Sequence, residues 1–523
     1  MSMRRVAIAG VVVLALLVLA ALAVRQSLRQ GPLLAAVEER LSEALGQPVT
    51  IGDLSVSFVP RVALTGRAVR VGDASEQAPA LDIQRIRILP RTGTLFSGRA
   101  DIEEVQLDGL TVSVLRDADG QWHVPAAVPA PATTTDGRIS IERVRVVNGR
   151  VLVFDGERGE APGETGAIDD ITAHVTIEEG GLRLSDVTAR IGGAQIAGEA
   201  RTDASVVRMA FTADAIEDRD LPQLLRLAGS DRPEFLRLQA PASVTADLRV
   251  DRSSLRFSGE GRLSAPQVAL DPLRLERFEA PFAIQGNRLS FKPATFALYG
   301  GTHQGTLVVH FGRGVPRWTM ESRVRELDIA AFLAALTGRD QRVDGRADVT
   351  ASLQGRIDAA LDQTVRGQVE LLVTNGVLRE FPLVAAVNNA LRLAETEGRD
   401  TRFERLSGTF TLSDARATTS DLRVDAGHVN VRVGGTIGFD RALALRGTAA
   451  IAAERVAEAV ARVRELARLR SPGGEIRLPL SISGTADAPS FDIDLMTAIE
   501  EGLGDELKRR LRDLFKRPGG GLP

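Results

Sequence analysis

The chain has 523 residues, 65 lysines and arginines against 68 aspartates and glutamates, and no cysteine. Balanced charge excludes the broad basic field with which nucleic-acid-binding proteins attract their ligand. The lack of cysteine excludes disulfides, thiolate metal sites and cysteine nucleophiles. Aromatic residues make up only 4% of the chain, which disfavours a sugar-binding or base-stacking protein, because both depend on exposed rings.

The N-terminal segment predicts a membrane anchor. Residues 6–24 (VAIAGVVVLALLVLAALAV) carry no charge, and as a helix they are roughly 28 Å long, close to the thickness of a bilayer core. We expect this helix to be retained, because the run is longer than a usual signal core and continues directly into Arg25. The alternative is a cleaved signal peptide with Ala21–Ala23 as its cleavage site. Both interpretations export the rest of the chain, which in a bacterium means the periplasm.

The chain after the predicted anchor, which we call the body, is predicted to consist mainly of β-strands. A short linker helix over residues 33–45 ends at Gly46 and Pro48, and from Val49 the hydrophobic period changes to two, as in half-buried strands. Similar segments, joined by glycine-rich turns, recur almost to the end of the chain. Helical patterns interrupt them at Leu221–Ala228, Ile329–Leu336, Pro382–Glu397 and Ile451–Arg470. We therefore predict an elongated, curled antiparallel sheet that forms a groove, with a few helices covering its edges or ends.

Residues 138–154 give the clearest hairpin pattern. The stretch RISIERVRVV alternates, Asn148 and Gly149 suit a tight turn, and Arg150–Phe154 returns. This hairpin would have an apolar side and a polar side, with Arg145 and Arg150 on the polar one. Four valines would share the apolar side and are the candidate groove-lining residues: Val144, Val146, Val151 and Val153.

No residue pattern points to catalysis, a cofactor or a metal. The five histidines are His123, His174, His303, His310 and His428. None has a metal-ligand spacing, and we expect each to be a solvated loop or strand-face residue. His303 and His310 are the nearest pair, and in a strand they would fall on opposite faces. Adjacent acidic pairs in strands point apart and make poor acid/base pairs, so we predict a protein that is not an enzyme.

The C-terminal segment predicts an amphipathic helix. Leucines from Leu495 to Leu514 form one helical stripe, and basic residues crowd its last turns. Four of these are candidate membrane-surface contacts: Lys508, Arg509, Arg512 and Lys516. Such a helix can lie on an anionic membrane or dock on a partner. The alternative is a helix that covers the last sheet edge, with its charges simply solvated.

Two regions of the body resemble AsmA-family envelope proteins. The N-terminal resemblance rests on residues 49–52 (VTIG), 60–64, 95–98 (LFSG), 102–115 (IEEVQLDGLTVSVL) and 116–122. The C-terminal resemblance rests on residues 367–371 (GQVEL), 375–378 (NGVL), 401–403, 406–410 (LSGTF), 419–422 (TSDL) and 434–439 (GGTIGF). The order and spacing of these blocks, behind a membrane anchor, carry the resemblance more than any single block does.

The resemblance implies an organisation and a function. We expect an anchor at 1–30, an AsmA-like N-terminal β region at 31–125, a middle β region at 126–360, an AsmA-like C-terminal β region at 361–490, and a helix and tail at 491–523. The implied function is conduction of phospholipid along an apolar β-groove from the inner membrane, influencing outer-membrane assembly and protein targeting to the membrane. The alternative is an anchored, non-enzymatic scaffold or assembly factor for envelope proteins, with its apolar faces closed as dry sandwiches. Neither interpretation involves nucleic acid.

Overall fold

The computed structural model describes residues 48–57, 61–72, 81–91, 100–116, 122–123, 139–155, 163–178, 181–203, 205–227, 236–251, 256–311, 315–339, 342–357, 361–391, 398–462, 470–471 and 473–493, with residues 35, 38, 39, 42, 393, 466 and 467. Within these residues no helix is long and apolar enough to cross a membrane. The predicted anchor at 6–24 lies outside them. So does nearly all of the predicted C-terminal helix.

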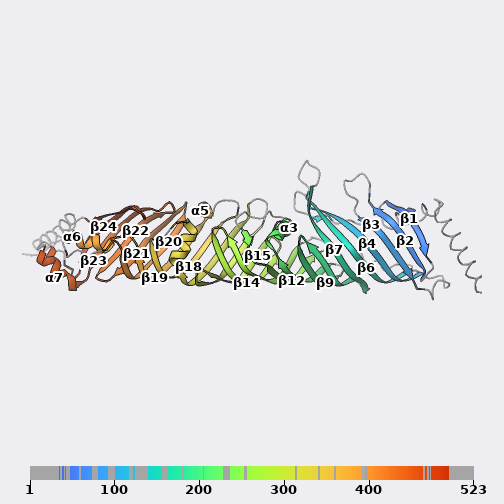
Figure 1. Ribbon diagram of the computed structural model, residues 1–523, viewed down its shortest axis with the longest axis horizontal. Helices are drawn as coiled ribbons and strands as arrows, with labels where there is room; N and C mark the ends of the chain where they lie inside the picture. Colours follow the sequence, from blue (N-terminus) through green and yellow to red (C-terminus); the bar gives the residue numbers. More distant parts are fainter. Residues whose placement is uncertain are drawn as a thin grey trace, which may run out of the picture. The chain divides into compact units, whose positions relative to one another are not determined.

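The described residues belong to two compact units. Unit 1 comprises residues up to 234 with 238–265 and 283–286, and unit 2 comprises 235–237, 266–282 and residues from 287 onward. The strands are the long, tilted ribbons of Figure 1. The prediction of a mainly β protein is confirmed, and the helices are few and short.

Unit 1 is built on neighbouring strands that are antiparallel with one exception. They are β1 (Val49–Ser57), β2 (Ala63–Val71), β3 (Leu81–Pro90), β4 (Ala100–Arg116), β5 (Trp122–His123), β6 (Ile139–Asp155), β7 (Gly163–Glu178), β8 (Gly181–Ile191), β9 (Ala194–Thr202), β10 (Val206–Ile216) and β12 (Ala242–Asp251). A 3-10 turn, η1 (Asp218–Asp220), and helix α3 (Leu221–Leu227) follow β10. The exception is the pair β4 and β6, which is parallel over its whole length.

Unit 2 is a simple meander in which each strand pairs with the next. Its strands are β15 (Arg288–Leu298), β16 (Gly301–His310), β17 (Arg317–Asp328), β18 (Val343–Arg356), β19 (Arg366–Leu378), β20 (Thr401–Ser413), β21 (Arg416–Ala426), β22 (Val429–Gly438), β23 (Ala442–Ile451), β24 (Ile476–Thr485) and β25 (Pro489–Ile493). Its helices are α4 (Ile329–Thr337), α5 (Leu361–Thr364), α6 (Leu383–Ala390) and α7 (Ala453–Arg462). Strands β11 (Leu236–Leu238), β13 (Phe257–Leu270) and β14 (Leu273–Gln285) contribute residues to both units.

The predicted helices are present, and two of them are shorter than expected. The first two agree closely with α3 and α4. Helix α6 ends at Ala390 rather than continuing toward Glu397, and residues 394–397 lie outside the described ones. Residue Ile451 is the end of β23, so that α7 begins at Ala453.

Residues with left-handed backbone bend the strands of unit 1. Asn148 in β6, Asp170 in β7 and Asp186 in β8 all have a φ between 51° and 53°. The pairing register shifts beside each of them. These are β-bulges, which add a residue to one strand, bend it and increase its twist. Because bulges recur on successive strands, the sheet of this unit is bent strand by strand.

The predicted hairpin at Asn148–Gly149 is wrong. Residues 139–155 form the single strand β6, and Asn148 lies at a bulge within it. The reason is that a left-handed residue serves a bulge as well as a turn. The bulge also keeps the four candidate valines on one face. Val146 and Val151 are five residues apart, which would place them on opposite faces of a regular strand, and the extra residue of the bulge between them restores the same face.

Helix α6 is held at its start by a distant residue. Its own N-cap residue, Pro382, makes no side-chain capping hydrogen bond. Instead the hydroxyl of Thr401, at the start of β20, accepts from the backbone N–H of Leu383 at 3.1 Å and donates to the carbonyl of Phe381 at 2.7 Å. Thr401 is 1% exposed, so water cannot replace it. Without it, the Leu383 N–H and the Phe381 carbonyl would have only the hydrogen bond that they make with each other, at 2.8 Å.

We predict that T401V loosens α6. The substitution keeps the shape of the side chain and removes these hydrogen bonds and a longer one from the Val384 N–H at 3.4 Å, which should cost about 1–2 kcal/mol. Hydrogen exchange of residues 383–390 should accelerate accordingly. The matched control is T411V, at an exposed position of the same strand, which should leave this exchange unchanged. Equal exchange in T401V and the wild type would contradict the capping role.

Candidate functional site

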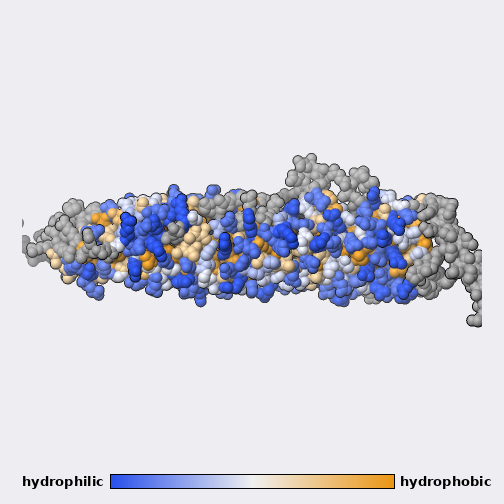
Figure 2. All heavy atoms as spheres, viewed as in Figure 1, coloured by the Kyte–Doolittle hydropathy of each residue, from blue (hydrophilic) through white to orange (hydrophobic). Residues whose placement is uncertain are grey.

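Each unit has an apolar face made by alternate residues of its strands. In unit 2 the register places His303, Val324, Val349 and Leu371 in one row across β16–β19, and Leu307, Met320 and Leu353 in another. The residues between them, such as Thr350, Gln354 and Gln368, are exposed. In the view of Figure 2 hydrophilic side chains cover much of the strand surface, with hydrophobic ones between them. This is the alternation that the sequence predicts.

The apolar face of unit 2 is incompletely covered over β16–β19. Seven large apolar side chains on it are only half-buried: Leu307, Trp318, Met320, Val349, Leu353, Val369 and Leu371. Helix α4 packs on β17 and β18, beside the ends of these strands, where Leu327 and Ala347 are fully buried. Elsewhere on these strands the face retains apolar surface that another apolar molecule could cover.

The same face is sealed over β22–β24. Val429, Val431 and Val433 of β22 are at most 3% exposed. The inward residues of β24, from Ile476 to Ile482, are equally buried. Val456 and Ala459 of helix α7, which follows β23, are both 0% exposed. One end of unit 2 therefore has a dry core, and the strands before it have a half-buried apolar face.

The structure places the four candidate valines of unit 1 on one face. In the parallel pair, Val144 lies opposite Val105, Val146 opposite Leu107, Val151 opposite Val112 and Val153 opposite Val114. Val144, Val146 and Val151 are half-buried, and Val153 is 4% exposed. Arg145 and Arg150 are exposed. That these valines line a lipid groove stays a prediction.

Helix α3 covers this face at one end. Gly166 of β7 pairs with Val153, and a Cβ on Gly166 would lie 3.0 Å from Leu227 Cδ2 of the helix. The Gln223 side chain donates to the carbonyl of Ala167 at 2.6 Å. The other end of β7 carries Ile177, which is 43% exposed. The face is therefore covered near Val153 and open at Ile177.

A histidine lies within the apolar face of unit 2. The ring of His303 stacks on Phe296 with centroids 3.9 Å apart and an interplanar angle of 7°. Phe278 stacks on Phe296 in turn and meets Phe291 edge to face. His303 is 2% exposed, whereas His310 on the same strand is exposed. Their placement on opposite faces is confirmed, and the expectation that His303 is solvated is wrong.

The His303 imidazole is neutral at ordinary pH. Burial lowers its pKa to about 4, and an interaction with the Ala294 backbone opposes this only in part. Neither ring nitrogen has a hydrogen bond of acceptable geometry within the described structure. Its register partners, Phe296 and Val324, carry no charge. The alternation His303, Gly305, Leu307, Val309 was the signal that could have placed this residue on the apolar face.

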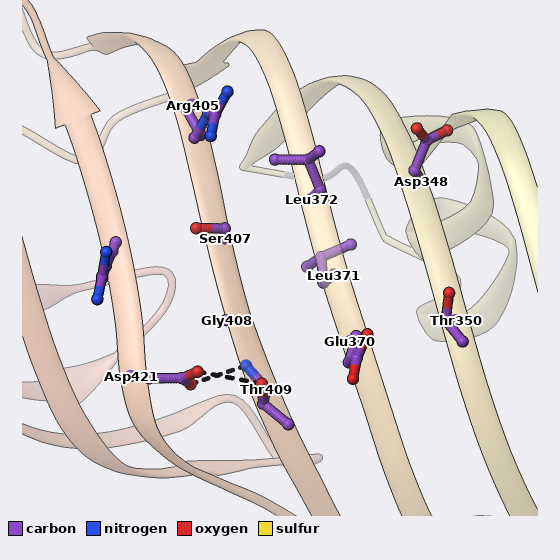
Figure 3. A pocket seen from close by; sticks show the side chains of 11 residues that line it. Asp348, Thr350, Glu370, Leu371, Leu372, Arg405, Ser407, Gly408, Thr409 and Asp421 are labelled. Atoms are coloured by element: carbon purple, nitrogen blue, oxygen red, sulfur yellow. Dashed lines mark hydrogen bonds between the residues drawn. The ribbon is translucent and has the colours of Figure 1, made fainter.

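The opposite, polar face has a shallow hollow over β18–β21. Its volume is about 480 Å³, and its charged lining residues are Asp348, Glu370, Arg405, Asp421 and Arg423. Figure 3 shows the Asp421 carboxylate accepting hydrogen bonds from Thr409, at 2.8 Å from its N–H and 3.0 Å from its hydroxyl. The hydrogen bond from the Thr409 backbone N–H is the main cause of the lowered pKa of Asp421. Charges of both signs line the hollow, so it favours no single ionic ligand.

The remaining site predictions lie outside the described residues. Lys508, Arg509, Arg512 and Lys516 all belong to the segment after residue 493. In the described ranges no group of three or more His, Asp or Glu residues is arranged to hold a metal ion. Within the described residues, the apolar faces are therefore the feature that best supports a function.

Part of the chain matches the model of a known protein family. Residues 240–422 match the AsmA family. The match contains most of the blocks behind the C-terminal resemblance, from residue 367 to residue 422, and β16–β19 with their half-buried apolar face. The blocks behind the N-terminal resemblance lie outside it. No curated protein matches the chain.

We predict that acid destabilises unit 2 through His303. The unfolded chain takes up a proton near the ordinary pKa of 6.5, while the folded chain does so only near 4. Stability is therefore fully present above pH 6.5 and is lost as the pH falls toward 4, by up to about 3 kcal/mol. His428, whose pKa burial also lowers, acts in the same direction. The urea midpoint followed by tryptophan fluorescence should fall over this range.

The variant H303F should flatten that pH dependence, because phenylalanine keeps a flat aromatic ring beside Phe296 and has no proton to gain. H310F is the control, since it changes an exposed histidine of the same strand and should titrate like the wild type. An equal loss of stability with acid in H303F and the wild type would contradict the assignment to His303.

Proposed function

The match over residues 240–422 supports membership of this chain in the AsmA family, and from that premise we propose that it binds phospholipid acyl chains on its apolar faces. The proposal extends to an inner-membrane-anchored protein with its body in the periplasm, which conducts phospholipid and thereby influences outer-membrane assembly. The observation that carries it is the half-buried apolar face on β16–β19, which lies within the matched region.

The energetics of lipid transfer favour such a face. Moving one acyl methylene into water costs about 0.8 kcal/mol, so two long chains cost on the order of 20 kcal/mol. Apolar side chains such as Leu307, Met320 and Leu353 can replace the bilayer as surroundings of the chains. The headgroup can stay in water beside the strand ends. No catalytic group is required.

The sealed core limits where lipid would lie in unit 2. The inward side chains of β22–β24 are almost fully buried and leave no exposed apolar surface for an acyl chain. We place the lipid contacts on β16–β19, where the face is half-buried. In unit 1 we place them on β4, β6 and β7 around Val144, away from the end that α3 covers.

The alternative is an anchored scaffold or assembly factor for envelope proteins. The observation in its favour is the dry core over β22–β24, which shows that the same strand alternation can close without lipid. Under this alternative, a partner protein or the chain itself would cover the remaining apolar surface. Lipid contact at inward positions distinguishes the two functions.

We predict that photo-crosslinkers at Val144 and Leu353 capture phospholipid in cells. Both side chains lie on an apolar face and are half-buried. The matched controls are the exposed neighbours Arg145 and Gln354, one residue away on the opposite face of the same strands. Lipid adducts should appear at the inward positions and be absent at the controls. Protein adducts alone at Val144 and Leu353 would favour the scaffold.

We predict that removal of residues 1–30 behind a cleavable export signal releases the body from the membrane. The apolar run at 6–24 is the proposed anchor, so the truncated protein should fractionate with soluble periplasmic proteins. Deletion of 505–523 in the same background tests the basic helix, by its effect on binding to anionic liposomes. Membrane retention after both deletions would contradict the proposed attachment.

A further inference from the structure

The polar face of unit 1 carries four arginines in one row across neighbouring strands. Arg201 of β9 lies opposite Arg183 of β8 on one side and opposite Arg208 of β10 on the other. Arg208 in turn lies opposite Arg249 of β12. Three of the four are exposed, and Arg183 is half-buried. We refer to these residues as the arginine row, in which neighbouring strands are about 4.8 Å apart.

This arrangement is unfavourable for the fold by itself, because like charges directly opposite each other destabilise a strand pair. The favourable arrangement occurs elsewhere in unit 1, where Arg70 lies opposite Asp82 and forms an ion pair of 3.3 Å with it. An anion bound along the arginine row would remove the repulsion between its members. The row therefore has the character of a binding site rather than of a stabilising contact.

Two members of the row have a carboxylate beside them and two do not. Arg183 lies 3.7 Å from the carboxylate of a neighbouring glutamate, and Arg208 lies 3.1 Å from that of an aspartate. Within the part of the chain that the structure describes, Arg201 and Arg249 have no ion pair. Their guanidinium groups are exposed and available to an anion from solution.

The arginine row follows a margin of the sheet. Each member lies one or two residues from an end of its strand. Farther from these ends, on the same face, three carboxylates are found at Glu199, Asp247 and Glu260. They would repel an anion, so the favourable position for one is at the strand ends.

The apolar face at the same margin is only half-buried. One residue nearer the strand ends than the arginines, and on the opposite face, lie the half-buried Leu182, Val207 and Val250. The next apolar row includes Met209 and Leu248, which are also half-buried. A molecule that crosses this margin can therefore have its hydrocarbon part on the apolar face and a charged part on the arginine row.

Unit 2 has a similar basic row on its own strand ends. The register places four exposed basic residues opposite one another across β15–β18: Arg288, His310, Arg317 and Arg356. The adjacent residues on the apolar face include Leu289 and Trp318, both half-buried. Each unit thus combines a basic row at strand ends with an incompletely covered apolar face.

We propose that the arginine row binds the phosphate group of a phospholipid whose acyl chains lie on the apolar face of the same strands. This inference rests on the proposed acyl-binding function and adds a headgroup contact to it. A guanidinium group presents paired N–H donors that match two phosphate oxygens. A phosphate beside Arg201 and Arg249 also supplies the negative charge that the described fold does not give them. A lipid with a neutral headgroup satisfies neither demand.

The test uses a photo-crosslinker at Val250, which reports lipid bound beside Arg249 on the purified full-length protein. The probes are lauroyl lysophosphatidic acid and monolauroylglycerol, which have the same acyl chain and differ in the phosphate. Below saturation we expect the phosphate-bearing lipid to give about tenfold more adduct, the ratio that about 1.4 kcal/mol from a charge-assisted hydrogen bond gives. Inorganic phosphate at the same concentration as the lipid should leave this ratio unchanged.

The double variant R201Q/R249Q should reduce the ratio to about two, because it removes the two guanidinium groups without an ion pair. Its yield with monolauroylglycerol should stay at the wild-type level. Its thermal midpoint should be no lower than that of the wild type, since the change relieves repulsion between like charges. The matched control is R145Q/R262Q, which removes the same charge from exposed positions of unit 1 outside the row and should keep the tenfold ratio.

The outcomes separate the two levels of the argument. Equal yields of the two lipids in the wild type, or an unchanged ratio in R201Q/R249Q, overturn the arginine row as a headgroup site and leave acyl binding intact. Loss of the ratio on addition of inorganic phosphate assigns the row to a free anion and overturns the headgroup contact. No adduct at Val250, with lipid captured at Val144 and Leu353, overturns this inference alone. No lipid at any of the three positions overturns acyl binding as well.

Discussion

The structure depends on one constraint, which is that each long strand carries an apolar face that must avoid water. A sheet usually meets this demand by packing against a second layer. The described helices of this chain are short, and α3 and α4 lie beside parts of strands only. The strands themselves must therefore provide most of the shielding. Bulges such as that at Asn148 serve this need, because they bend a strand while its hydrogen-bond ladder continues on either side of the extra residue.

The faces of the strands could be predicted from the sequence, because alternation is a local signal. It placed Val144 and Val153 together even though the interpretation of Asn148 as a turn residue was wrong. A turn and a bulge both need a left-handed residue, and the choice between them depends on which strand pairs alongside. In this chain the partner is β4, in parallel, and no local pattern encodes that pairing.

Other features could not be predicted because they join distant residues. The cap of α6 comes from Thr401, eighteen residues beyond Leu383, and a lone threonine at the start of a strand gives no sign of that role. His303 was predicted as solvated from its residue type, although the alternation of Gly305 and Leu307 placed it on the apolar side. At that position the strand register prevailed over the preference of the imidazole for water.

Unit 2 shows that alternation alone does not decide whether an apolar face is available to a ligand. Strands β16–β19 and β22–β24 follow the same pattern, and what differs is the cover. The inward residues of β22–β24 are buried, as are Val456 and Ala459 of α7, while α4 shields the earlier strands near Leu327 and Ala347. The two sets of strands thus differ in how far their apolar side chains are buried, although the alternation along them is the same, and the surface that remains on β16–β19 is what a ligand or a partner could cover.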